Sequence, residues 1–206
     1  MKRLFDFIFS LSGLILLTPI LLPATLIVYL QDYYSPFYVS NRVGKNGDLF
    51  KMIKLRSMVR NADKTGVDST SRNDNRITPI GHLIRKYKLD ELTQLINVFL
   101  GSMSFVGPRP NIKKETDIYT HLELDLLKVK PGITDIASIV FSDEGDILSN
   151  SEDPDIDYNQ LIRPGKSELG LFYVKNSSLT LDIKLIIITL LGIFSRKYSL
   201  TKLRQV

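Results

Sequence analysis

Lys88-Leu89-Asp90-Glu91-Leu92-Thr93-Gln94-Leu95, followed closely by Gly107-Pro108-Arg109-Pro110, is the stretch on which the interpretation of the whole chain rests. Two adjacent carboxylates, Asp90 and Glu91, come directly after the cationic run Arg85-Lys86-Tyr87-Lys88. Carboxylates can bind a metal ion or attack phosphorus, and cations beside them can hold phosphate. The pattern therefore indicates phosphoryl-transfer chemistry.

The same two acids also have a purely structural interpretation. A helix over residues 90–100 is expected, with apolar residues at helical spacing, and Asp90 stands where it could begin. Asp is a favoured N-cap residue, and Glu in the first turn suits the helix dipole. This segment alone leaves both interpretations open.

Arg109 lies between two prolines. Pro110 disfavours helical geometry at the residue before it, so Arg109 is expected on an extended, stiff backbone. A guanidinium held in this way loses little entropy when it binds phosphate, and its planar fork can bind bidentately. The alternative is an ordinary exposed arginine in a loop.

Composition limits the classes of function. The chain has 206 residues, 44% of them hydrophobic, which is enough for one domain with an attached element. The absence of cysteine excludes disulfides, thiolate metal sites and cysteine nucleophiles. A net charge of +5 and a pI near 9.3 favour anionic partners. With only His82 and His121, the chain is poorly suited to a histidine-rich metal site.

An apolar segment opens the chain. From Leu4 to Leu30 the only charged residue is Asp6, and about 20 helical residues suffice to cross a bilayer. The run is longer than the apolar core of a signal peptide, about 7–15 residues, and no clear cleavage site follows. Asp6 is expected to stay at the interface or to pair with Lys2 or Arg3.

Two prolines determine the expected path of this segment. Pro19 and Pro23 each remove a backbone donor and should kink or break the helix. A straight span with Lys2 and Arg3 inside would place the basic domain outside the cell, away from intracellular nucleotides. A re-entrant helix that enters and leaves by the same face avoids this conflict and is preferred, with a kinked span as its rival.

A basic hairpin is expected over residues 37–58. Asn46-Gly47 is a strong turn signal, and the segment after it partly alternates like a half-buried strand. Its cationic face either binds phosphate or faces anionic lipid; the basic residues are Arg42, Lys45, Lys51, Lys54, Arg56 and Arg60. Polar residues over 61–76 predict a loop.

Helices are also expected over residues 80–85 and 181–194. The apolar run inside the second helix, residues 185–194, is too short to cross a membrane, so this helix should lie in the interface or pack on the core. Residues 136–141 are apolar and rich in β-branched side chains, and acids dominate residues 143–157.

Taken in order, these motifs resemble the monotopic phosphoglycosyl transferases, also called bacterial sugar transferases or undecaprenyl-phosphate sugar-1-phosphate transferases. The resemblance covers nearly all of the chain. It rests on Lys2-Arg3-Leu4-Phe5-Asp6, Thr18-Pro19, Ser35-Pro36-Phe37, Arg42-Val43-Gly44, Leu89-Asp90-Glu91-Leu92, Gln94, Asn97-Val98, Val106-Gly107-Pro108-Arg109-Pro110 and Pro131-Gly132-Ile133-Thr134.

The resemblance implies an α/β fold, in detail a helix-rich α+β arrangement. Residues 1–33 would form a re-entrant helix-break-helix anchor, with the break at Thr18 and Pro19. Residues 34–206 would form a small catalytic domain with interfacial amphipathic helices and a short sheet or hairpin. The implied location is the bacterial inner membrane, with the catalytic domain on the cytoplasmic face.

The resemblance also implies a reaction. A UDP-sugar would donate its sugar 1-phosphate to undecaprenyl (polyprenyl) phosphate, releasing UMP and starting the synthesis of a lipid-linked glycan. Asp90 would be the nucleophile, Mg²⁺ would bridge its carboxylate and the diphosphate, and Glu91 would support the metal or the nucleophile. Arg85 and Arg109 match family arginines that contact phosphate, and Lys54 is a further candidate cation.

The chain departs from the family pattern after Thr134. Many members continue with Gly, an aromatic and Ala-Gln, whereas Asp135-Ile136-Ala137-Ser138 follows here. Ser142 stands near the position where some relatives carry an arginine, which leaves sugar and nucleotide recognition open. Thr93 replaces a proline or leucine frequent in the family, a change expected to have no consequence. The sugar, the pathway and homo-oligomer formation also stay open.

The alternative function is a non-catalytic, membrane-anchored scaffold whose basic face binds anionic lipid or a partner enzyme. A scaffold should tolerate Asp90→Asn, so Asp90 separates the two functions. A nucleic-acid binder is disfavoured, because no recognition motif is present and a membrane segment precedes the basic region. Flanking arginines and an anchor in the required order favour catalysis by the Asp90-Glu91 pair.

Overall fold

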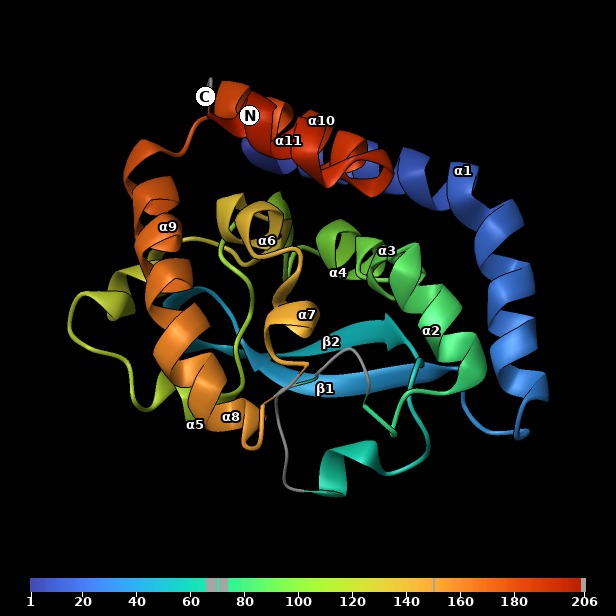
Figure 1. The fold of residues 1–206 in the computed structure, drawn as a ribbon. Helices are drawn as coiled ribbons and strands as arrows, with labels where there is room; N and C mark the ends of the chain where they lie inside the picture. Colours follow the sequence, from blue (N-terminus) through green and yellow to red (C-terminus); the bar gives the residue numbers. More distant parts are fainter. Residues whose placement is uncertain (66–69, 71–73, 150, 205–206) are drawn as a thin grey trace.

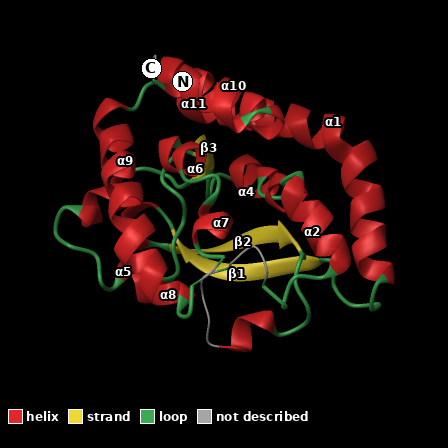
Figure 2. Cartoon of the chain, viewed as in Figure 1, coloured by secondary structure: helices red, strands yellow, loops and turns green. Residues whose placement is uncertain are grey.

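A β-hairpin lies at the centre of the computed structural model, which describes residues 1–65, 70, 74–149 and 151–204 (Figures 1 and 2). Strand β1 (Phe37–Val43) pairs antiparallel with β2 (Leu49–Leu55). The turn between them places Asn46 at φ 59° and Gly47 at φ 85°, the left-handed region that tight hairpin turns require. The expected hairpin is confirmed, whereas seven of the sixteen residues of the loop expected over 61–76 lie outside the described residues.

Short helices surround this hairpin in the described part of the chain. After the single-turn segments η1 (Lys45–Gly47) and η2 (Ala62–Thr65) come α2 (Pro79–Lys86), α3 (Leu89–Leu92), α4 (Leu95–Leu100), α5 (Lys113–Thr116), η3 (Glu123–Lys128), α6 (Ile136–Val140), α7 (Glu144–Ile147), α8 (Pro154–Asp157), η4 (Tyr158–Ile162), α9 (Arg163–Asn176), α10 (Leu179–Phe194) and α11 (Arg196–Leu203). A second, parallel pair joins β3 (Ser104–Val106) to β4 (Gly132–Thr134). The fold is therefore helix-rich α+β, as expected.

The helices expected over residues 80–85 and 181–194 are confirmed as α2 and α10, but the helix expected over residues 90–100 is two helices. Helix α3 begins at Leu89, and Lys88 occupies the N-cap position with a left-handed backbone at φ 53°. Asp90 is therefore not the cap residue, and no side chain makes a capping hydrogen bond there. The expectation that Asp90 caps a helix is therefore wrong. Its carboxylate makes no capping hydrogen bond to the backbone at the start of α3.

Helix α1 (Lys2–Leu30) runs unbroken through Pro19 and Pro23 but is visibly bent (Figure 1). Each proline removes a hydrogen bond to the carbonyl four residues earlier, which is a known cause of kinks. The Thr18 hydroxyl donates to the Leu14 carbonyl at 2.7 Å, a contact that also bends helices. The expected break at Thr18 and Pro19 is thus a bend within one helix.

The burial pattern of α1 is inverted relative to a soluble protein. Its only buried residues are Asp6, Ser10 and Val28. Its large apolar side chains are mostly exposed; they include Leu4, Phe9, Ile15, Leu16, Leu22 and Leu26. The helix is long and apolar enough to cross a membrane. A core helix of that composition would be mostly buried, so the exposed apolar surface fits contact with lipid.

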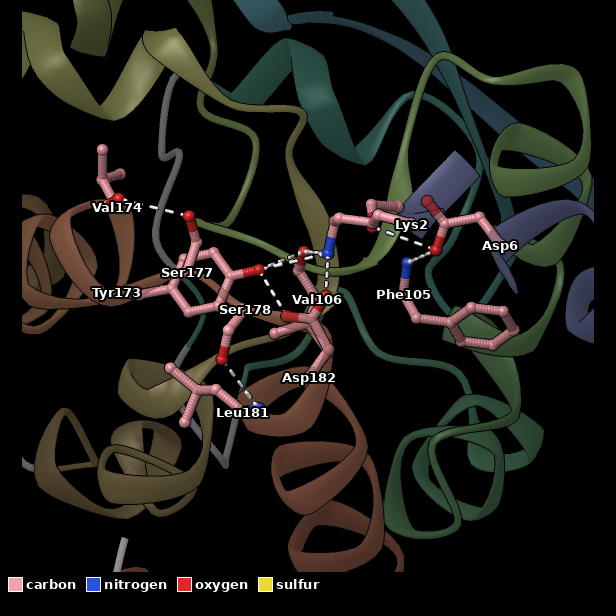
Figure 3. A network of polar contacts seen from close by, with 11 residues as sticks. Lys2, Asp6, Phe105, Val106, Tyr173, Val174, Ser177, Ser178, Leu181 and Asp182 are labelled. Carbon is pink, nitrogen blue, oxygen red and sulfur yellow. Dashed lines mark hydrogen bonds and ion pairs between the residues drawn. The ribbon is translucent and has the colours of Figure 1, made fainter. Parts of the chain in front are cut away.

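Polar contacts hold the start of α1 against the rest of the protein (Figure 3). Lys2 forms an ion pair with the buried Asp182 of α10 and donates to the Val106 carbonyl at 3.1 Å. Tyr173 of α9 donates to Asp182 at 2.6 Å, so three elements meet at one carboxylate. Asp6 accepts hydrogen bonds from the Phe105 backbone at 3.2 Å and the Ser104 hydroxyl at 3.1 Å. Asp6 therefore binds β3 instead of pairing with Lys2 or Arg3, and the alternative expectation that it stays at the interface remains a prediction.

The far end of α1 is anchored as well. Arg56 donates through both terminal nitrogens to the Asp32 carboxylate at 2.5 Å, just after the helix ends. Arg56 is buried and also reaches the Val28 carbonyl at 3.4 Å. This residue therefore does not belong to a solvated cationic face. Both ends of α1 contact the same domain.

The main core lies between β3, α6, α9 and α10; its buried members are Val106, Ile136, Ile139, Tyr173, Leu185 and Ile188. Helix α6 forms from β-branched residues because Asp135 caps it, accepting from the Ser138 backbone at 2.6 Å. Helix α10 packs one face on this core and leaves other apolar side chains exposed, notably Ile187, Leu190 and Phe194. This arrangement is typical of a helix at a membrane interface.

Side chains from the α3–α4 segment make hydrogen bonds to the β2 backbone groups that a third strand would otherwise pair with. Asn97 accepts a hydrogen bond from Ile53 N at 3.0 Å and donates to the Lys51 carbonyl at 2.7 Å. The Thr93 hydroxyl donates to the Ile53 carbonyl at 3.1 Å. Thr93 is buried, and its hydroxyl makes a contact that a proline or leucine at this position would lack. These contacts fix α3, and with it Asp90, against β2.

We expect Asn97→Ala to lower the free energy of unfolding by about 2–4 kcal/mol, because it leaves one backbone donor and one acceptor of β2 unsatisfied. Denaturant unfolding of the detergent-solubilised protein measures this change. Thr201→Ala, which removes an exposed hydroxyl bonded within α11, should change it by less than about 0.5 kcal/mol. Equal stability of Asn97→Ala and wild type would contradict the proposed role of Asn97.

Candidate active site

The position of Arg109 is fixed by backbone contacts on both sides. Gly107 donates to the Thr134 carbonyl at 3.1 Å, and the Pro108 carbonyl accepts from Gly132 at 3.1 Å. A Cβ on Gly132 would lie 2.1 Å from Gly107 N, so the close approach of these two segments requires glycine. On the other side, the carbonyl of residue 111 accepts from the backbone of residue 43 at 2.9 Å. The expected non-helical, stiff backbone at Arg109 is confirmed.

Glu91 and Arg109 form the direct link between α3 and this segment. Their side chains make an ion pair of 2.9 Å between Oε1 and Nη2. Burial works to raise the pKa of Glu91, but the charges of Arg109 and Lys54 outweigh it and lower this pKa to about 2. The pKa of Arg109 is raised, chiefly by Glu91. Glu91 is therefore an anion at neutral pH, with one oxygen bound to an arginine.

Asp90 has a different electrostatic environment. Burial raises its pKa, and the neighbouring Glu91 carboxylate raises it further. Three cations act in the opposite direction and favour the ionised form; they are Lys54, Arg85 and Arg109. A carboxylate attacks phosphorus only when ionised, so these cations are required for that role. The structure thus brings together all five charged residues predicted for the site.

The other two cations come from different elements. Lys54 lies half-buried on β2, and burial together with the charge of Arg109 lowers its pKa to about 8. Arg85 lies in the last turn of α2 and donates through Nε to the Ser57 hydroxyl at 2.9 Å. That contact uses Nε and leaves the terminal nitrogens, which among the described residues make no other hydrogen bond, for a phosphate.

Thr18 and Pro19 do not belong to this cluster. They lie within α1, where the Thr18 hydroxyl bonds to its own helix. They were predicted to form the break of the membrane helix. In the structure they lie in α1 and are not part of the charged cluster.

Magnesium was expected to bind Asp90 and Glu91. Among the residues that the structure describes, three or more acids or histidines do not gather into a metal site. Mg²⁺ is nevertheless commonly bound by one or two carboxylates, with substrate phosphates and water completing its coordination. Asp90 fits this mode. Glu91 fits less well, because Arg109 already binds one of its oxygens.

The structure contains a pocket beside Arg109, and most of its lining residues were not predicted from the sequence. Its wall includes Tyr119, Tyr158 and Lys166, which no motif singled out. Asp135 and Ser138 also line it, and only their departure from the family pattern pointed to this region. These residues come from segments far apart in the chain, so spacing alone could not have assembled them.

An arginine does reach Ser142, but from the other end of the chain. Arg196 of α11 donates to the Ser142 hydroxyl at 3.0 Å and to Asp143 at 2.7 Å. This contact could not be predicted from the sequence, because 54 residues separate the two partners.

Comparisons with known proteins identify the family of this chain. The family model described as bacterial sugar transferase matches residues 1–196. The exopolysaccharide production protein PSS of Rhizobium leguminosarum bv. phaseoli is 34% identical, covering 95% of this chain and 96% of that protein. The UDP-glucose:undecaprenyl-phosphate glucose-1-phosphate transferase of Klebsiella pneumoniae is 35% identical over 95% of this chain.

A third relative is the UDP-N-acetylgalactosamine-undecaprenyl-phosphate N-acetylgalactosaminephosphotransferase of Aeromonas hydrophila, 30% identical over 92% of this chain. The chain spans 42% of that protein and 40% of the Klebsiella transferase. The Rhizobium protein, in contrast, matches over nearly its full length. With a family model covering almost the whole chain, the resemblance inferred from the motifs is confirmed: this chain belongs to the bacterial sugar transferase family and is a transferase.

Proposed function

We propose that this chain transfers sugar 1-phosphate from a UDP-sugar to undecaprenyl phosphate, releasing UMP and starting a lipid-linked glycan. The observation that carries the proposal is the cluster of two carboxylates and three cations. Asp90 is the carboxylate in this cluster that is not ion-paired at 4 Å or less among the described residues, whereas Glu91 is held by Arg109. Names of relatives supply the substrate class, since they specify undecaprenyl phosphate as acceptor and UDP-glucose as one donor.

In the first step, a carboxylate oxygen of Asp90 attacks the phosphorus atom that carries the sugar. The bond from that phosphorus to the bridging oxygen breaks, and UMP leaves with the bond's electron pair. Arg85, Arg109 and Lys54 bind the phosphate oxygens, because two anions approach each other only when their charges are compensated. The product is a covalent aspartyl-phosphosugar.

In the second step, a phosphate oxygen of undecaprenyl phosphate attacks the same phosphorus. The bond to Asp90 breaks, which regenerates the carboxylate and yields the lipid diphosphate sugar. A covalent intermediate lets a soluble donor and a lipid acceptor use one site in turn. Glu91 keeps Arg109 aligned in both steps. Bound at Asp90, Mg²⁺ would supply further charge neutralisation for the diphosphate.

The anchoring of α1 supports the re-entrant topology, with residues 1–33 as the anchor and residues 34–206 as the catalytic domain. Lys2 and Asp32 both bind to the catalytic domain, through Asp182 and Arg56. A helix that crossed the bilayer would place its two ends on opposite sides, where one domain could not hold both. The proposed location is the cytoplasmic face of the bacterial inner membrane, where UDP-sugars and the lipid acceptor meet.

We expect Asp90→Asn to lower UMP release by at least about a thousandfold, because the amide cannot form the covalent intermediate. UMP release is measured with detergent-solubilised protein, Mg²⁺, undecaprenyl phosphate and UDP-glucose, UDP-galactose or UDP-N-acetylgalactosamine. Asp117→Asn, at an exposed ion pair with Lys113, is the matched control and should keep wild-type activity.

Equal release by wild type and Asp90→Asn would remove Asp90 as the nucleophile. Failure of folded wild-type protein to release UMP from every donor would instead favour the scaffold function, in which the basic face recruits lipid or a partner enzyme. Trapping of a labelled phosphosugar on wild type but not on Asp90→Asn separates a covalent mechanism from direct transfer.

Removing Mg²⁺ with a chelator tests whether UMP release requires the metal. We expect excess EDTA to lower UMP release on the order of a hundredfold or more, and added Mg²⁺ to restore it. Circular dichroism should stay unchanged, because no cluster of metal-binding side chains supports the fold in the described ranges. Full activity in EDTA would show that Lys54 and the arginines suffice.

The pH dependence tests Lys54. Its pKa of about 8 makes the amine positive below that pH and neutral above it. We expect kcat/KM, which reports the free enzyme, to fall as pH rises through about 8, because the neutral amine no longer attracts phosphate. In Lys54→Arg this fall should move upward by more than about one pH unit, since arginine stays charged. An alkaline fall at the same pH in both proteins would exclude Lys54 as its origin.

A further inference from the structure

The pocket beside Arg109 is a candidate for the part of the donor that does not react. The pocket is open to solvent, and its cavity volume is about 40 Å³. Arg109 belongs both to its wall and to the charged cluster around Asp90. A donor whose diphosphate is bound by Arg109 can therefore extend a neighbouring ring into this pocket.

Asp135 is the unusual group in the wall. Its side chain lines the pocket, although the residue is only 3% exposed. One oxygen accepts from the Ser138 backbone at 2.6 Å. An ionised carboxylate has about four acceptor positions, so capacity remains for a ligand. Burial raises the pKa of Asp135, while Ser138 and the charges of Arg109 and Lys166 oppose that shift.

Capping of α6 does not by itself explain a buried carboxylate. Asp153 caps α8 in the same way, accepting from two backbone N–H groups, and is exposed to solvent. Asn or Ser would cap equally well without placing a charge in the interior. The burial of Asp135 against a pocket therefore points to a second role.

The charges around the pocket select the chemistry of its ligand. Lys166 is ion-paired with Glu144, and Arg163 is ion-paired with Glu123 at 3.1 Å. These two cations are compensated, so apart from Arg109 the wall offers no surplus positive charge for a phosphate. It suits a neutral ring that donates hydrogen bonds. Tyr119 and Tyr158 line the same pocket, and aromatic side chains are common in the walls of small-molecule sites.

We propose that Asp135 is the residue that selects the donor sugar, its carboxylate accepting a hydrogen bond from a hydroxyl of the sugar ring bound in this pocket. The proposal rests on the transferase function above and specifies where that function recognises its donor. A donor without the hydroxyl would leave a buried carboxylate oxygen without a partner. Sites built in this way reject such analogues strongly.

Asp135→Asn tests the assignment, because Asn keeps the size of the side chain and the cap of α6. We expect kcat/KM for the preferred UDP-sugar to fall about tenfold or more, with a change in the order of preference among UDP-glucose, UDP-galactose and UDP-N-acetylgalactosamine. Inhibition by UDP, which lacks the sugar, should change less than about twofold. Asp153→Asn is the matched control and should alter none of these values.

Donor analogues that lack one sugar hydroxyl make the test specific. The analogue without the contacted hydroxyl should react poorly with wild type, and Asp135→Asn should cause little further loss with it. Additive losses for every analogue would overturn the proposal. Thermal unfolding of both variants establishes that the differences do not arise from misfolding.

The remaining outcomes separate this proposal from the transferase function. Turnover by wild type with unchanged relative kcat/KM values in Asp135→Asn would overturn the proposal and leave the transferase function standing. Equal weakening of UDP and UDP-sugar would place the ribose, not the sugar, against Asp135 and would also overturn it. Absence of turnover by wild type would refute both.

Discussion

The ion pair between Glu91 and Arg109 is the interaction on which the candidate site depends. It joins α3 to the segment that follows β3; side-chain hydrogen bonds hold the first against β2, and backbone hydrogen bonds hold the second against β4. Thr93 and Asn97 fix the carboxylate side against β2. The close approach of Gly107 and Gly132 fixes the arginine side. Each charged group therefore meets its partner without a large loss of side-chain freedom.

Two adjacent carboxylates acquire different properties because one of them has an arginine partner. Arg109 lowers the pKa of Glu91, while burial and the charge of Glu91 raise the pKa of Asp90. Asp90 is left to interact with Lys54 and Arg85 at longer range. A phosphate arriving at these cations brings negative charge toward Asp90, so the site needs an excess of positive charge. This requirement explains why three cations surround two acids.

Helix α1 is held to the rest of the protein at both of its ends. Lys2 binds Asp182 and the Val106 carbonyl, and Val106 is the last residue of β3 before the segment that carries Arg109. Arg56 binds Asp32 just beyond the other end. Asp6 and Ser10 of α1 are buried against the protein, while most of its large apolar residues stay exposed. The site is thereby held at a fixed place relative to the surface that faces lipid.

Local patterns in the sequence determined the hairpin at Asn46-Gly47, helices α2 and α10, the apolar helix α1 and the identity of Asp90, Glu91 and Arg109 as candidate site residues. These features depend on neighbours in the chain, so periodicity, turn residues and motif spacing reveal them. The tertiary structure alone decided that Asp6 binds β3, that Thr93 and Asn97 support β2, and that Asp135 faces a pocket with Tyr119 and Tyr158. Those contacts join residues far apart in sequence, and a buried polar group finds its partner only when the packed chain removes water from both.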